Sequence, residues 1–142
     1  MSFTSNLTNT RKEELLASRS GSCFLSTLIV DVRDCDFEGG NIACAINYPS
    51  KSFNAHEGVR EDLARKVIDG EVRKVVFHCM HSRERGPACA RAFEITLKRV
   101  LATHFPDFLE KTIEVSVLSG GYHSFSSAYL TVHPDIFANT YN

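Results

Sequence analysis

The sequence predicts an α/β fold with a mainly parallel central sheet and helices on both faces. Short runs of β-branched and aromatic residues alternate with segments whose apolar residues recur at helical spacing. No internal repeat or low-complexity tract interrupts this alternation, which implies right-handed crossovers between parallel strands. A length of 142 residues with 43% hydrophobic residues suits one domain, 1–142, with its own core.

The first elements are predicted from caps, turns and β-branched runs. The four residues that begin at Thr10 have the spacing of a capping box, so a short helix should follow them. Residues 24–32 are typical of a buried strand. A second short strand is predicted over 43–48, where a proline ends it, and 50–58 is predicted to be a loop.

The second half alternates more regularly between strand and helix. Apolar residues at four-residue spacing predict an amphipathic helix over 59–69, which a glycine ends. Residues 74–77 form a short apolar run of strand type, and a long apolar stripe predicts a helix over 86–105. A further strand is expected over 113–118 and a short helix over 122–129.

Composition excludes several classes of partner and location. A formal net charge of −1, from 16 basic and 17 acidic side chains, gives no electrostatic basis for binding nucleic acid or an anionic membrane. No apolar run approaches membrane-spanning length, and the start of the chain lacks the features of a signal peptide. We expect an intracellular protein, cytoplasmic or nuclear.

The cysteine pattern favours a reduced protein. Five cysteines are an odd number and include no Cys-x-x-Cys pair, so neither a disulfide framework nor a zinc site is suggested. They are Cys23, Cys35, Cys44, Cys79 and Cys89. We therefore expect free thiols and no metal.

The stretch from Val75 to Pro87 contains the candidate catalytic chemistry. It leads from a strand through Cys79 and a polar loop into a helix that starts near a proline. Backbone N–H groups of such a loop, and the positive end of the helix, meet beside the sulfur, where they favour a thiolate and a bound dianion. Arg85 can hold two oxygens of that dianion. A buried, inert cysteine is the alternative, but the loop is too polar to be core.

The segment between Cys79 and the helix is the predicted oxyanion loop. Its residues are Met80, His81, Ser82, Arg83, Glu84 and Arg85. Glu84 is the candidate general acid, because a leaving alkoxide or phenoxide needs a proton. The alternative is that Glu84 pairs with Arg83 or shapes the loop.

Three further polar residues are predicted to support the site rather than to react. His78 precedes the cysteine in a strand, where adjacent side chains face opposite ways, so it should hold the loop by hydrogen bonding. Asp31 and Arg33 stand at the end of another strand, at the sheet edge where ligands bind. A structural role, in which they pair with each other or cap loops, is preferred to a role in ligand binding.

The pattern His78-Cys79, five residues, Arg85 resembles the signature of cysteine-based phosphatases. Residues 84–87, Glu-Arg-Gly-Pro, resemble the Cdc25 branch of the rhodanese superfamily. The resemblance implies the rhodanese-like three-layer fold, a nucleophilic Cys79 and an oxyanion-binding Arg85.

Two other stretches are similar to the same family. Residues 28–33 followed by 37–42 resemble its opening strand and Glu-Gly-Gly-His-Ile turn, with Asn41 in place of the histidine. Residues 117–122 are similar to its Leu-x-Gly-Gly-Tyr segment. The resemblance therefore spans about 28–130.

The resemblance implies a protein tyrosine or dual-specificity-type phosphatase that works through a phosphocysteine, without cofactor, on a phosphorylated protein or a small oxyanion. Eukaryotic arsenate and antimonate reductases resemble the same template, so arsenate reduction with glutathione or a glutaredoxin-like protein is the alternative. Thiosulfate sulfurtransfer is less favoured, because a five-residue loop suits a tetrahedral oxyanion better than a single sulfur. A non-catalytic binding module would need neither Cys79 nor Arg85.

Oxidation of Cys79 gives a last expectation. In the Cdc25 group, a cysteine in the first strand traps the oxidised nucleophile, but Val32 stands there in this chain. A disulfide needs Cα atoms within about 7 Å. We expect Cys35 or Cys44, near strand ends, to be a better partner than Cys89.

Overall fold

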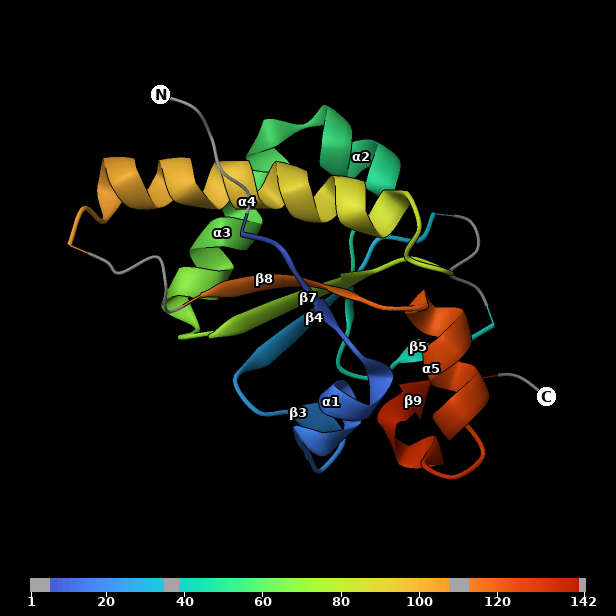
Figure 1. Cartoon of the computed structure of the whole chain (residues 1–142). Coiled ribbons are helices and arrows are strands. Elements are labelled where there is room, and N and C mark those ends of the chain that lie inside the picture. The colour runs from blue at the N-terminus through green and yellow to red at the C-terminus, as the bar shows by residue number, and fades with distance from the viewer. Residues whose placement is uncertain (1–5, 35–38, 108–112, 141–142) are drawn as a thin grey trace.

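The computed structural model describes residues 6–34, 39–107 and 113–140 (Figure 1). At its centre lies a five-stranded sheet in the order β1-β8-β7-β4-β6, in which every neighbouring pair is parallel. Its strands are β1 (Thr8–Thr10), β4 (Thr27–Asp31), β6 (Ile46–Asn47), β7 (Lys74–His78) and β8 (Glu114–Leu118). The predicted parallel sheet is confirmed.

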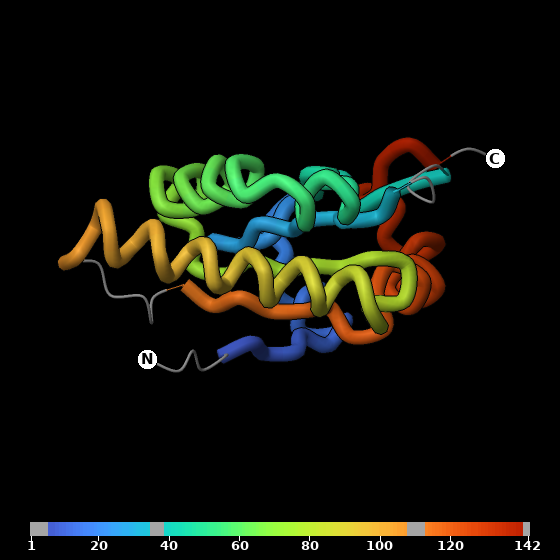
Figure 2. The backbone as a smooth tube through the Cα atoms, turned by 90° about the horizontal axis from the view of Figure 1, so that it is seen from above, coloured from blue at the N-terminus to red at the C-terminus, as the bar shows by residue number. Residues whose placement is uncertain are grey.

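Helices cover both faces of this sheet, as predicted. One face carries α2 (Ser50–Ala55), α3 (Glu57–Asp69) and α4 (Arg85–His104) (Figure 1). The other face carries α1 (Lys12–Ala17), α5 (Gly121–Tyr129) and the 3-10 turn η3 (Pro134–Ile136). Seen from above, α3 and α4 lie side by side (Figure 2). Among the described residues, no helix has the length and apolar character needed to cross a membrane.

The central strand β7 divides the core into two clusters. Phe77 packs on the α4 side, where its ring centroid lies 5.7 Å from that of Phe53 and 5.4 Å from that of Phe93. Its neighbour Val76 faces the other side and belongs to the cluster of Phe125. This alternation follows from the two-residue period of a strand and explains the continuous apolar run, since both faces are buried.

The predicted cap at Thr10 is wrong. Thr10 ends the edge strand β1, and its buried hydroxyl lies 2.6 Å from Ser116 Oγ on β8. Helix α1 starts two residues later, and the Glu14 carboxylate accepts from Arg11 Nε at 2.9 Å. A cross-strand bond satisfies the threonine, and the N-cap residue is Arg11, whose backbone N–H donates to Glu14 Oε1 at 3.4 Å.

Two other predicted segments are divided differently. The strand predicted over 24–32 splits into β3 (Cys23–Phe24), which pairs antiparallel with β2 (Arg19–Ser20), and β4. The loop predicted over 50–58 contains α2, a six-residue helix held by the fully buried ring of Phe53. So short a helix has no apolar period for the sequence to show.

The strand predicted over 43–48 is shortened to β6, and a separate strand β5 (Asn41–Ile42) precedes it and pairs with β9 (Phe137–Ala138). Asn41 stands where the resembling family has histidine. Its amide donates to the Ile42 carbonyl at 2.9 Å and accepts from Asn139 at 2.9 Å. Asn41 therefore fastens the C-terminal segment to the end of the sheet.

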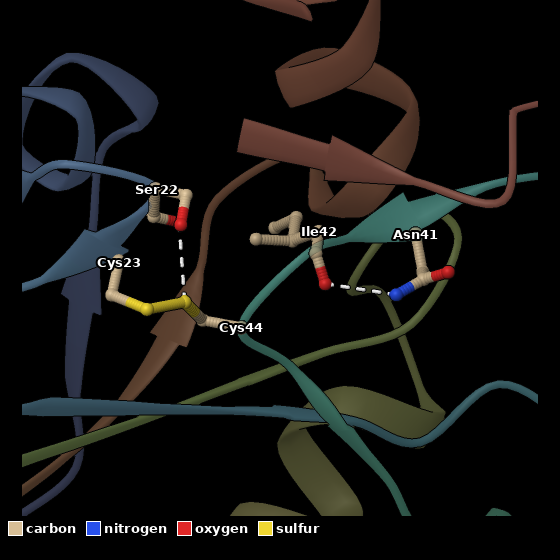
Figure 3. The surroundings of a disulfide bond; sticks show 5 residues. All are labelled: Ser22, Cys23, Asn41, Ile42 and Cys44. Carbon is tan, nitrogen blue, oxygen red and sulfur yellow. Dashed lines mark hydrogen bonds between the residues drawn. A yellow bond between two sulfur atoms is a disulfide. The ribbon is translucent and has the colours of Figure 1, made fainter. Parts of the chain in front are cut away.

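A disulfide between Cys23 and Cys44 joins β3 to the segment between β5 and β6 (Figure 3). The prediction of free thiols is wrong for this pair, because folding brings the two Cα atoms, 21 residues apart in sequence, within 5.5 Å. Cys44 therefore pairs with Cys23 and not with Cys79, contrary to the expectation for oxidation. Cys35 lies outside the described residues, and Cys79 and Cys89 are the free cysteines of the described part.

Candidate active site

Cys79 lies at the carboxyl edge of the sheet, directly after β7 and six residues before α4. Its side chain is buried, and its Sγ accepts the backbone N–H of Ser82 at 3.2 Å and of Gly86 at 3.3 Å. The second donor belongs to the first turn of a 20-residue helix, whose positive end faces the sulfur. The strand, oxyanion loop and helix thus lie as the sequence predicts, around one sulfur atom.

Helix α5 sets the direction of the loop amides. The carbonyl oxygens of Cys79 and Met80 accept the N–H groups of Tyr122 at 3.0 Å and His123 at 2.8 Å. These carbonyls point toward α5, so the opposite side of the loop presents N–H groups to Sγ. Ser82 assists this turn with a positive φ of 56°, and its buried hydroxyl has no hydrogen-bond partner in the described part of the chain.

The second glycine of the Gly-Gly-Tyr segment, Gly121, is required by the close approach of α5 to the oxyanion loop. A Cβ atom on Gly121 would lie 2.6 Å from the Met80 carbonyl oxygen and 2.7 Å from that of Cys79. Its φ of 62° is also in the left-handed region that favours glycine. A residue without a side chain therefore lets α5 approach the oxyanion loop closely enough to bind it.

Asp31 and Arg33 form a buried ion pair, as expected. Arg33 Nη2 lies 2.7 Å from Asp31 Oδ2, and it also donates to the Gly40 carbonyl at 2.8 Å. The guanidinium carbon lies 4.1 Å from the centroid of the Tyr122 ring. These contacts join the end of β4 to the start of α5, and α5 in turn donates hydrogen bonds to the oxyanion loop.

His78 is fully buried and faces the same ion pair. Its Nδ1 lies 3.1 Å from the Cys79 carbonyl oxygen, while Nε2 is 3.8 Å from Asp31 Oδ2 and has no hydrogen-bond partner in the described residues. Burial lowers the pKa of His78 below its ordinary value, although the charge of Asp31 acts in the opposite direction. We infer a neutral imidazole that donates to the loop carbonyl, in the structural role that the sequence predicts.

The depressed pKa of His78 makes stability depend on pH. Below pH 6.5, the ordinary pKa of histidine, the unfolded chain binds a proton that the folded chain excludes. The free energy of unfolding should therefore fall with decreasing pH, by up to about 1.4 kcal/mol per pH unit from this site. In urea unfolding between pH 7.5 and 5.5, the free energy of unfolding should depend less steeply on pH for His78→Asn than for the unchanged protein. His104→Asn is the control, because His104 is exposed. The same pH dependence of the free energy of unfolding in His78→Asn and His104→Asn would contradict the inference.

Arg85 is the first residue of α4, and its side chain contacts a residue that sequence reasoning missed. Its Nη1 lies 3.4 Å from Oδ2 of Asp34, 51 residues earlier in the chain. Asp34 also accepts from Ser50 Oγ at 2.5 Å and from the Lys51 N–H at 3.3 Å. Asp34 could have been predicted as a site residue from the sequence, because it follows Asp31 by three residues and lies beyond the end of the same strand.

The remaining loop side chains form the rim of the site. Glu84 is exposed at the residue before α4, and its side chain makes no hydrogen bond or ion pair within the described residues. His81 is also exposed, and its ring centroid lies 5.1 Å from that of His123. Met80 is partly buried against the cluster on the α5 side, and Arg83 is exposed. Backbone N–H groups thus contact the sulfur, whereas the side chains of His81, Arg83 and Glu84 are exposed.

The described residues contain no candidate metal site, and their cavity lies away from Cys79. No group of three or more histidine, cysteine, aspartate or glutamate side chains is placed to hold a metal ion. A cavity of about 430 Å³ lies beside the distal half of α4, where Glu94, Leu97 and Leu101 contribute to its lining. Leu97 follows Arg85 by three helical turns, so the cavity is remote from Cys79.

Known proteins are similar to this chain over most of its length. The rhodanese-like domain family matches residues 12–128. The dual specificity phosphatase ibp1 of Schizosaccharomyces pombe is 33% identical over 110 residues, which cover 71% of this chain and 75% of that protein. The M-phase inducer phosphatase of the same species is 33% identical over 112 residues, which cover 78% of this chain but 17% of that protein.

A solved structure is also similar to nearly the whole chain. The As-Sb reductase from Leishmania major has a TM-score of 0.78 and 28% sequence identity, and the match covers 93% of this chain and 85% of that chain. The chain belongs to the rhodanese-like domain family and, within it, to the Cdc25-like branch.

Proposed function

We propose that the protein hydrolyses phosphate monoesters through a phosphocysteine. The observation that carries this proposal is the pair of backbone N–H groups on Cys79 Sγ, at 3.2 and 3.3 Å. Amides that stabilise a thiolate also stabilise the equatorial oxygens of a phosphoryl group transferred to it. The buried, unpaired hydroxyl of Ser82 adds a donor beside them.

The reaction has two displacements. Cys79 Sγ attacks phosphorus in line; an S–P bond forms as the bond from phosphorus to the ester oxygen breaks, and the leaving oxygen takes a proton. Water then attacks phosphorus and breaks the S–P bond, which releases phosphate and restores the thiolate. Arg85 and the loop amides hold the oxygens throughout. A phosphorylated protein side chain or a small phosphate ester fits this chemistry.

Arsenate reduction is the second candidate, and the similarity to the Leishmania major As-Sb reductase favours it. Arsenate has nearly the shape and charge of phosphate. Cys79 would attack arsenic(V) with loss of water, and two electrons from glutathione or a glutaredoxin-like thiol would reduce it to arsenic(III) as two thiols become a disulfide.

Parallel assays test these candidates. We expect turnover of para-nitrophenyl phosphate by the purified chain in the absence of added metal. Arsenate, glutathione and glutaredoxin form the second assay. Arsenate reduction without ester hydrolysis would replace the first candidate by the second. Neither activity, in a folded sample, would leave a binding module.

Glu84 is the proposed general acid, and its exposed side chain in the oxyanion loop, at the residue before α4, supports this role. Glu84→Gln should slow phenyl phosphate by about tenfold or more but para-nitrophenyl phosphate little, because nitrophenoxide leaves without protonation. Steady-state rates over a series of aryl phosphates give the dependence on leaving-group pKa. Equal slowing across the series would make Glu84 a loop-shaping residue.

A further inference from the structure

Asp34 lies between β4 and α2 and faces Arg85, but no role in the chemistry has been given to it. We propose that Asp34 is a positioning residue, which orients the Arg85 guanidinium for the transition state and weakens ground-state binding of the oxyanion. The proposal rests on the proposed function, because it assigns Arg85 to the transferred group.

The first argument is that Asp34 is itself held firmly. Its carboxylate accepts Ser50 Oγ at 2.5 Å and the Lys51 N–H at 3.3 Å, both from the first turn of α2. The Ser50 N–H in turn donates to the Val32 carbonyl at 3.2 Å, so the first turn of α2 is tied to the end of β4. A carboxylate fixed at both oxygens is a rigid reference point for a flexible arginine.

The second argument concerns the arginine. Arg85 is 35% exposed, and a side chain of that length loses considerable rotamer freedom when it is held in one geometry. Contact between its Nη1 and Asp34 Oδ2, at 3.4 Å, reduces that freedom before any substrate binds. Preorganised charge of this kind lowers the barrier because the donor need not reorient during the reaction.

The third argument is the charge balance of the site. The Asp34 carboxylate is a negative charge that lies 3.4 Å from Arg85 Nη1, the group proposed to hold the oxyanion. An incoming dianion is repelled by this carboxylate, which therefore opposes its binding. Burial alone would raise the pKa of Asp34, but hydrogen bonds from Ser50, Lys51 and Arg85 lower it below its ordinary value, so the carboxylate is ionised. A group in that state orients a cation and does not donate a proton.

The test separates the two effects by removing the charge. Asp34→Asn keeps an oxygen acceptor for α2, and it should lower KM for para-nitrophenyl phosphate about fivefold while it lowers kcat about tenfold. In a Cys79→Ser background, calorimetry with inorganic phosphate should show about fivefold tighter binding after the same change. Asp34→Glu should restore part of kcat. A merely structural role would lower kcat without tighter binding.

Two controls make the outcome specific. Asp62→Asn removes an exposed charge on α3 and should leave both constants unchanged. Ser50→Ala removes the 2.5 Å hydrogen bond but keeps the carboxylate, so phosphate affinity should stay within about twofold. Unchanged or weaker phosphate binding by Asp34→Asn, with normal binding by Cys79→Ser, overturns this inference alone. Absence of phosphate binding by Cys79→Ser itself overturns the proposed function and the inference with it.

Discussion

Cys79→Ser is expected to reduce turnover of para-nitrophenyl phosphate by about 10⁴-fold or more, because a serine hydroxyl at neutral pH is a poor nucleophile. The amides of Ser82 and Gly86 remain in place, and so does Arg85. Inorganic phosphate should therefore still bind, with the affinity set by these donors. Steady-state kinetics and titration calorimetry on the same preparation measure the two properties.

Cys89→Ala is the matched control for this experiment. Cys89 is the other free cysteine of the described residues and is fully buried in the same core cluster. Burial raises the pKa of the Cys89 thiol to about 11, so it is protonated at neutral pH and carries no nucleophilic thiolate. Turnover should survive this replacement. Turnover retained by Cys79→Ser above a few per cent would exclude the phosphocysteine mechanism.

Gly121→Ala is expected to have the second largest effect, although residue 121 contributes no functional group. The added Cβ would lie 2.6 Å from the Met80 carbonyl oxygen, 2.7 Å from that of Cys79 and 2.8 Å from the His81 carbonyl carbon. All three are backbone atoms of the segment that surrounds the sulfur, so the helix or the loop must move. We expect a loss of about 3 kcal/mol in the free energy of unfolding. Turnover should fall about 100-fold, because small displacements of catalytic groups are costly.

Gly21→Ala distinguishes this overlap from backbone strain. Gly21 has a φ of 66°, close to the 62° of Gly121, but a Cβ there would meet no atom within 4 Å. Its replacement should cost about 1 kcal/mol of stability and leave turnover unchanged. Urea unfolding and para-nitrophenyl phosphate kinetics on both variants give the comparison. Equal losses of activity would show that contact between α5 and the oxyanion loop does not hold the site.

Local pattern accounts for much of the fold and for the nucleophile. The apolar run before Cys79, the polar loop and the periodic helix after it all depend on neighbours in sequence, so they could be predicted from the sequence. The ion pair of Asp31 and Arg33 spans two residues and could be predicted for the same reason. Helix α2 could not, because its six residues show no period and depend on buried Phe53.

Contacts between distant segments depend on the tertiary structure. Asp34 contacts Arg85, which is 51 residues away in sequence, and Thr10 contacts Ser116, which is 106 residues away. Cys23 is bonded to Cys44 because folding brings β3 next to the turn between β5 and β6. Composition and spacing describe what each segment can form, but which side chains meet depends on the register and packing of the sheet. The sequence therefore identifies Cys79 as the candidate nucleophile, whereas the tertiary structure decides that α5 binds the loop carbonyls and that Asp34 lies beside Arg85.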